Sequence, residues 1–143
     1  MFLAGFITVL TNPVTMAIMV ACVIVGIIFG AIPGLSATMA IAMALPMTYG
    51  MTPFNGVAAM IGLYIGGISG GLISAILLNI PGTPSSIATC FDGRPLALKG
   101  EAGKALGIGI FYSFIGTILS IFALVAIAPL LADMAIKFGP FEY

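Results

Sequence analysis

Long uncharged apolar segments alternate with short polar interruptions along most of this chain. Residues 14–32, 54–80 and 105–131 form three such segments, and each is long enough to cross the hydrocarbon core of a bilayer as a helix. Asn12 and Pro13 precede the first segment as a helix cap and a first-turn proline. The pattern therefore predicts an all-α membrane protein with about three transmembrane helices.

Two shorter apolar stretches follow Pro-Gly pairs at positions 33–34 and 81–82. Neither stretch is long enough to cross a bilayer as a straight helix. Irregular backbone at membrane depth is tolerated only inside protein or beside a water-filled cavity. We therefore expect two re-entrant helical hairpins, at about residues 33–46 and 81–91, with Pro46 ending the short helix of the first.

The stretches 32–40 and 80–88 are similar, because each begins with Ile-Pro-Gly, continues into hydroxyl-bearing residues and follows a long apolar segment. If one full span separates the two hairpins, they enter the membrane from opposite sides, which is the geometry of an inverted repeat. We interpret residues 1–143 as a single transmembrane region that contains this repeat.

Charge is scarce, and its distribution narrows the possible functions. Charged residues make up 6% of the chain, hydrophobic residues 62%, and the mean hydropathy is +1.31. A net charge of zero offers no basic surface for nucleic acid. Histidine is absent, and Cys22 and Cys90 lie in apolar segments without zinc-ligand spacing, so we interpret them as packing residues. No catalytic, metal or phosphate motif is present, so we expect neither an enzyme nor a cofactor.

The membrane orientation follows from the basic residues. Three of the four lie in the segment 92–104, which the positive-inside rule places in the cytoplasm. Counting back along the chain places Met1 on the same side, with residues 1–10 along the interface. Residues 92–95, Asp-Gly-Arg-Pro, read as a solvated turn at the membrane surface. The abrupt end at Tyr143 indicates a fragment of a longer protein.

The segment 79–86 holds the richest chemistry. Thr83 is placed to cap a helix and Pro84 to begin it, which would leave the amides of the next three residues directed outward at the positive helix end. An anion can bind such amides without any arginine. Ser36 and Thr38 offer hydroxyls at the corresponding helix start after the first Pro-Gly pair. The alternative for both segments is a kink that serves packing alone.

A glycine-rich stretch, residues 62–71, contains overlapping small-xxx-small patterns. Such patterns allow two membrane helices to approach closely. We interpret these glycines as packing residues, and Tyr64, Ser69 and Ser74 as interhelical hydrogen-bonding residues rather than ligand-binding ones.

Several motifs resemble a known family. They are Leu78-Asn-Ile-Pro-Gly-Thr-Pro84, Ala88-Thr89, Asp92-Gly-Arg-Pro95, Lys99-Gly100, Gly103-Lys-Ala-Leu-Gly107 and, less specifically, Gly30-Ala-Ile-Pro-Gly34. Over nearly its whole length the chain resembles the large membrane subunit of tripartite tricarboxylate transporters, the TctA family. It departs from that family in being several times shorter and in carrying Leu35-Ser36 where many members have Leu-Gly.

The resemblance implies ion-gradient-driven import of citrate-like carboxylates across the bacterial inner membrane, with a small membrane subunit and a periplasmic substrate-binding protein as partners. The expected substrate-binding residues are Pro33, Gly34, Ser36, Thr38, Asn79, Pro81, Gly82, Thr83, Ser85 and Ser86. A coupling cation, sodium or a proton, is expected near Asn79, Thr89 and Asp92. A non-transporting membrane scaffold or assembly subunit is the alternative function.

Overall fold

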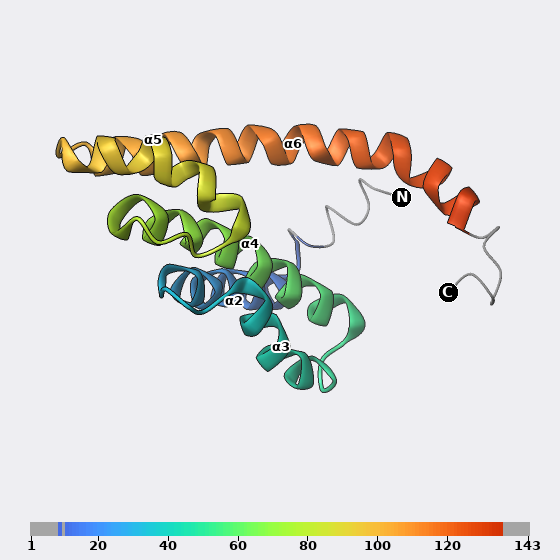
Figure 1. Cartoon of the computed structure of the whole chain (residues 1–143). Helices are drawn as coiled ribbons and strands as arrows, with labels where there is room; N and C mark the ends of the chain where they lie inside the picture. Colours follow the sequence, from blue (N-terminus) through green and yellow to red (C-terminus); the bar gives the residue numbers. More distant parts are fainter. Residues whose placement is uncertain (1–8, 10, 136–143) are drawn as a thin grey trace, which may run out of the picture. The chain divides into compact units, whose positions relative to one another are not determined.

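The computed structural model describes residues 9 and 11–135, and these form helices joined by short turns, with no strand among them (Figure 1). The helices are α2 (Pro13–Ala31), α3 (Ala37–Thr48), α4 (Pro53–Leu78), the 3-10 helix η1 (Pro84–Ser86), α5 (Ile87–Leu98) and α6 (Ala102–Ala135). The all-α prediction is confirmed. Three helices, α2, α4 and α6, are long and apolar enough to cross a membrane. Apart from Val9, the expected interfacial stretch 1–10 lies outside the described residues.

The chain divides into two compact units, Met1–Gly107 and Ile108–Tyr143. The first unit contains α2 to α5 and the start of α6, and the second contains the rest of α6. In the second unit nearly every described side chain is exposed, as a lipid-facing helix requires. All the residues discussed below lie in the first unit.

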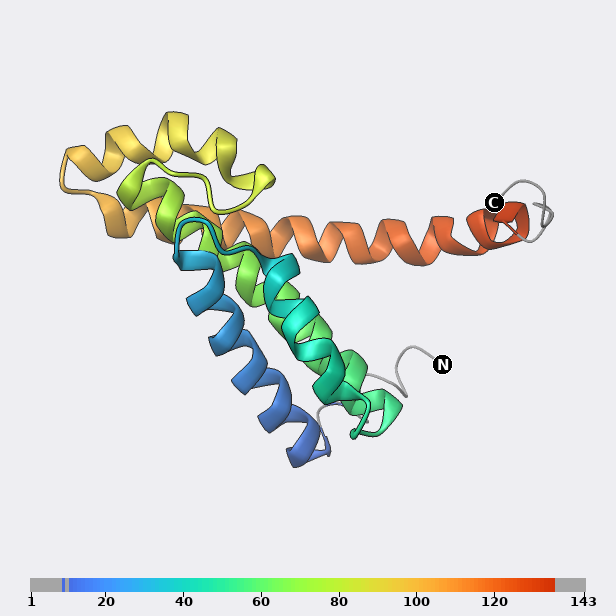
Figure 2. The same cartoon turned by 60° about the horizontal axis from the view of Figure 1, so that its bottom comes forward.

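Helices α2 and α4 pack backbone against backbone. Three glycines of α4 each face a carbonyl oxygen of α2, four residues further along each time: Gly62 against Met19, Gly66 against Val23 and Gly70 against Ile27. A side chain at any of these positions would collide with α2. The packing role predicted for the glycines is therefore confirmed. The residue numbers of the two helices rise together along this series of contacts, so α2 and α4 run parallel (Figure 2).

Helix α3 runs antiparallel to α4. It begins where Ala37 contacts Gly67 and ends where Thr48 contacts Gly56, near the start of α4. The chain thus returns to the end of the bundle at which α2 begins. A re-entrant hairpin at residues 33–46 would instead enter and leave through one membrane face, and α2 and α4 would then run antiparallel. Pro46 does not end the helix, contrary to our expectation, because in the last turn a proline costs only one backbone hydrogen bond.

The segment 79–98 folds back along α4 and then runs forward again. Asn79 ends α4 in a left-handed conformation with φ +58°, and Thr83 then contacts Gly71, two turns below the end of α4. Helix α5 advances from there until Gly93 reaches Ile76. The backbone therefore first runs back alongside the last two turns of α4, and α5 then runs forward past the end of α4.

Residues 92–95 are helical, so the turn predicted for them is wrong. Two contacts with α4 stabilise the helical conformation of this sequence. Gly93 leaves room for the Ile76 side chain, and the Arg94 guanidinium donates a hydrogen bond to the carbonyl oxygen of Leu77. A cation at the carbonyl end of a helix is favourable. Only the short turn at residues 99–101 joins α5 to α6.

Local signals set the other helix starts. The Asn12 side chain accepts hydrogen bonds from the amides of Val14 and Thr15, as predicted for the start of α2. The buried Thr15 hydroxyl donates to the Asn55 side-chain oxygen at 2.7 Å and so ties the first turn of α2 to that of α4.

Candidate functional site

A pocket of about 320 Å³ lies between the starts of α3 and η1 and the middle of α4. Its walls come from all three elements: Ser36, Ala37 and Thr38; Thr83, Pro84 and Ser85; and Tyr64 and Ile68. Four hydroxyl residues predicted to bind substrate therefore meet in one place, although they come from two distant parts of the sequence. We call this space the hydroxyl pocket.

The hydroxyl pocket lies near half the length of α4. Tyr64 and Ile68 are the twelfth and sixteenth of the 26 residues in this helix. At about 1.5 Å per residue, both are within roughly 4 Å of its midpoint along the axis. Secondary transporters commonly bind substrate at this depth, where broken helices expose backbone and hydroxyl groups.

The four serine and threonine hydroxyls of the pocket form two pairs. The Ser36 and Thr38 oxygens are 2.6 Å apart, and the Thr83 and Ser85 oxygens are 3.0 Å apart. Each pair holds two O–H groups and uses one of them internally, so each pair retains one donor for a ligand. A carboxylate accepts hydrogen bonds through both of its oxygens, and such charge-assisted bonds are stronger than neutral ones.

Ser86, in contrast, serves the turn itself. Its side chain is 1% exposed. Its hydroxyl donates to the carbonyl oxygen of Thr83 at 2.8 Å and accepts from the Thr83 amide at 3.2 Å. Ser86 thus fixes the conformation of the residue that lines the pocket.

Two of the three amides expected to point outward are used within this turn. The Ser86 amide donates to the carbonyl of Thr83, and the Ile87 amide donates to that of Pro84. The first turn closes as a 3-10 helix, whose shorter hydrogen-bond spacing engages these amides. The expectation of three free amides is therefore wrong, while Thr83 and Pro84 begin the helix as predicted.

The two predicted glycines have different roles. Gly34 has φ +91° with open space around it, so it serves the turn that leads into α3. A Cβ on Gly82 would lie 2.7 Å from the carbonyl oxygen of Gly30 and 2.9 Å from the Cα of Gly71. Gly82 therefore permits a close approach to α2 and α4. Neither Gly34 nor Pro33 lines the hydroxyl pocket.

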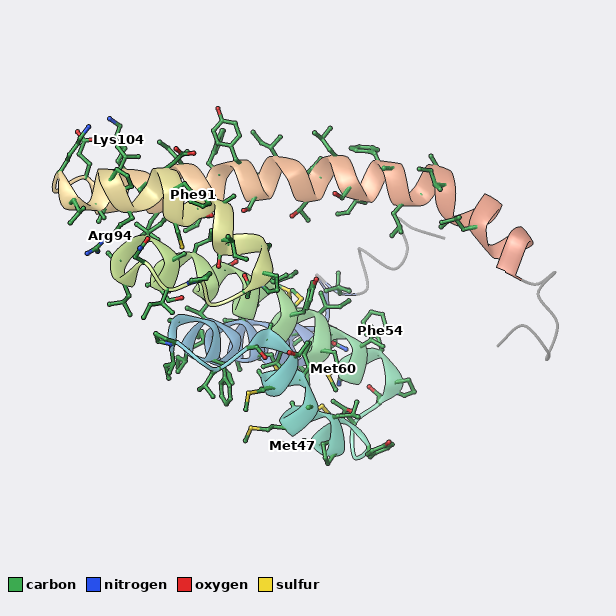
Figure 3. All side chains as sticks on the ribbon, viewed as in Figure 1. Met47, Phe54, Met60, Phe91, Arg94 and Lys104 are labelled. Carbon is green, nitrogen blue, oxygen red and sulfur yellow. The ribbon has the colours of Figure 1, made fainter. Side chains whose placement is uncertain are left out.

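A second pocket, of about 360 Å³, lies between this turn and α5. Asn79 and Pro81 line it together with residues of α5: Ile87, Cys90, Phe91, Arg94 and Pro95. Figure 3 labels Phe91 and Arg94. Of the three residues expected near a coupling cation, Asn79 lies here, whereas Thr89 and Asp92 line neither of the two pockets, and Asp92 is exposed.

Sequence reasoning did not identify the α4 wall of the hydroxyl pocket. Tyr64 and Ile68 lie one helical turn apart on α4, within the glycine-rich stretch 62–71. This spacing places them on one face of the helix and was the available sequence signal for this wall. The interhelical role expected for Ser74 is wrong, because its hydroxyl donates to the Gly71 carbonyl of the same helix at 3.2 Å.

Fold and pocket together define a multi-pass membrane protein with a hydroxyl-lined site at mid-span. The model of the tripartite tricarboxylate transporter TctA family matches residues 16–143. The chain belongs to this family, whose members are transporter components and not enzymes.

A curated relative from Agrobacterium vitis, described as an uncharacterized 52.8 kDa protein in the TAR-I ttuC' 3' region, is 40% identical over 92 residues. The match covers 64% of this chain and 18% of the relative, so the matched part of the chain corresponds to less than a fifth of that protein. No solved structure matches the chain.

Proposed function

We propose that this chain forms part of a secondary transporter that imports tricarboxylates or related small organic anions, such as citrate, driven by a cation gradient. Family membership supports the transport role. The observation that carries the proposal is the convergence of Ser36, Thr38, Thr83 and Ser85 on one pocket near the middle of a membrane-length helix.

Neutral groups hold the anion in this proposal. Among residues 9 and 11–135, no lysine or arginine lines the hydroxyl pocket, and the chain has no histidine. The free hydroxyls of the two pairs would each contribute about 1.5–3 kcal/mol in a bond to a charged carboxylate. The start of α3 adds the positive end of its helix dipole. We propose that these neutral donors bind the anion and also allow its release during a transport cycle.

We propose a membrane arrangement that is based on the positive-inside rule and is compatible with the packing of the first unit. We place the turn 99–101 in the cytoplasm on the positive-inside rule, and we propose that residues 79–98 dip into the membrane and return to that same face. Because α2 and α4 run parallel, the start of α2 lies at the opposite end of the bundle. This replaces the expectation that the N-terminal side of α2 and the segment 92–104 share the cytoplasmic face.

A coupling cation and two partners complete the proposal. Backbone carbonyls freed near Asn79 are candidate ligands for sodium, and Thr89 and Asp92 on α5 remain candidates for sodium or proton coupling. Family membership favours a small membrane subunit and a periplasmic substrate-binding protein as partners, in the inner membrane of a bacterium.

Reconstitution tests this function. The complete large subunit containing this chain, together with its small subunit, would be placed in proteoliposomes with the binding protein outside, and uptake of radiolabelled citrate, succinate and tartrate measured. Uptake of at least one anion under an inward sodium or proton gradient is expected, and it should collapse with an ionophore. Absence of gradient-driven uptake of all three from a correctly assembled complex would favour the scaffold role.

A further inference from the structure

We propose that Tyr64 is a specificity-determining residue of the hydroxyl pocket: its phenolic hydroxyl binds a second oxygen-bearing group of the anion, so that the site selects di- and tricarboxylates over monocarboxylates. This inference rests on the function proposed above and assigns a residue that the sequence motifs do not mark.

Tyr64 is the pocket side chain whose hydroxyl has no partner. The other hydroxyls are paired with each other across 2.6 Å and 3.0 Å, whereas the Tyr64 hydroxyl makes no hydrogen bond within residues 9 and 11–135. Tyr64 is 52% exposed, so the residue is not enclosed by the rest of the first unit. A phenolic O–H group can donate a hydrogen bond to an anion.

Its depth makes a partner necessary. Tyr64 lies within roughly 2 Å of the midpoint of α4 along the helix axis. At the centre of a bilayer an unpaired hydroxyl is unfavourable, because lipid supplies neither a donor nor an acceptor. A bound anion in the pocket satisfies this hydroxyl.

The pocket walls explain the selectivity. The two hydroxyl pairs come from the starts of α3 and η1, whereas Tyr64 comes from α4. The pocket volume of about 320 Å³ falls within the range of small-molecule sites, so the pocket can hold more than a single carboxylate group. A ligand with a second carboxylate extends to the α4 wall, and a monocarboxylate with an apolar tail leaves the Tyr64 hydroxyl without an anionic acceptor.

The test compares Tyr64→Phe with Tyr49→Phe in the complete large subunit. Phenylalanine removes the hydroxyl and keeps the ring, so packing is preserved. Tyr49 is a matched control because its side chain is 86% exposed and does not line the pocket. Binding of citrate, succinate and butyrate to protein in nanodiscs would be measured by calorimetry, with butyrate also measured by competition.

Tyr64→Phe should lower the affinity for citrate or succinate about tenfold or more, as expected for losing a hydrogen bond to a charged group, while butyrate binding stays unchanged. Tyr49→Phe should match wild type for all three. A Tyr64→Phe protein that keeps the wild-type preference, or that loses affinity equally for butyrate, overturns the role of Tyr64 while leaving the transport proposal intact. A wild-type protein that binds none of the three anions and transports none overturns the proposed function instead.

Discussion

Valine at Gly82 should nearly abolish transport without preventing membrane insertion. The added Cβ would lie 2.7 Å from both the Gly30 carbonyl oxygen and the Ser74 hydroxyl oxygen, and 2.9 Å from the Gly71 Cα. Ordinary contact begins near 3.4 Å, so the backbone of residues 81–83 must move by about 0.5 to 0.7 Å, and the two Cγ atoms of valine increase the displacement. Overpacking of this kind costs about 1–3 kcal/mol.

This displacement acts directly on the site, because the next residue along the chain lines the hydroxyl pocket. Binding geometry must be held to within about 0.5 Å, so we expect uptake to fall at least tenfold. Gly103→Val is the control, since Gly103 is also a glycine of the first unit but lies in α6 and has nothing within 4 Å of its added Cβ. It should transport at close to the wild-type rate.

The assay is initial uptake of radiolabelled citrate or whichever anion the wild type transports, divided by the amount of protein in the membrane. Detergent solubility and a fluorescence-detected elution profile would report folding separately. A Gly82→Val protein that inserts normally and transports at the wild-type rate per molecule would refute the reasoning, because the turn would then be a packing kink with no role in binding.

Three further outcomes are expected. Ser86→Ala should destabilise the protein by about 1–3 kcal/mol, because it leaves the buried Thr83 amide without an acceptor. The thermal unfolding midpoint should therefore fall, and an unchanged midpoint would contradict this role of Ser86. The pair Ser36→Cys and Ser85→Cys should crosslink with a short bifunctional reagent, since both residues line one pocket, and separate labelling without crosslinking would contradict it. Gly100→Cys should be protected from impermeant thiol reagents in intact cells, and labelling from outside would reverse the proposed orientation.

The sequence alone was sufficient to predict the elements whose signals are local. Asn12 and Pro13 mark the start of α2, and Thr83 and Pro84 mark that of η1, because capping and first-turn chemistry depend on adjacent residues. The three spans follow from apolar length. Ser36, Thr38, Thr83 and Ser85, which line the hydroxyl pocket, are among the residues predicted to bind substrate, because they follow Pro-Gly interruptions in apolar segments, and substrate binding by them stays a prediction.

Packing between distant segments was not predictable in the same way. The direction of α3 depends on Ala37 fitting against Gly67, and the extension of α5 depends on Arg94 reaching the carbonyl of Leu77. Neither contact leaves a mark in local sequence, so the sequence predicts a turn at residues 92–95. The sequence predicts Tyr64 as an interhelical hydrogen-bonding residue, because its spacing of one helical turn from Ile68 does not by itself distinguish a pocket wall from a packing face.

The central claim is that an organic anion occupies the hydroxyl pocket, and substrate protection tests it most directly. In a complete large subunit with Cys22 and Cys90 replaced by alanine, Ser85→Cys would be modified by a small thiol reagent with and without the transported anion, with Gly103→Cys as the control. An occupied pocket predicts that the anion slows modification at position 85, with a concentration dependence that matches its binding, and leaves position 103 unaffected. Equal modification rates at position 85 with and without a saturating transported anion would contradict the claim.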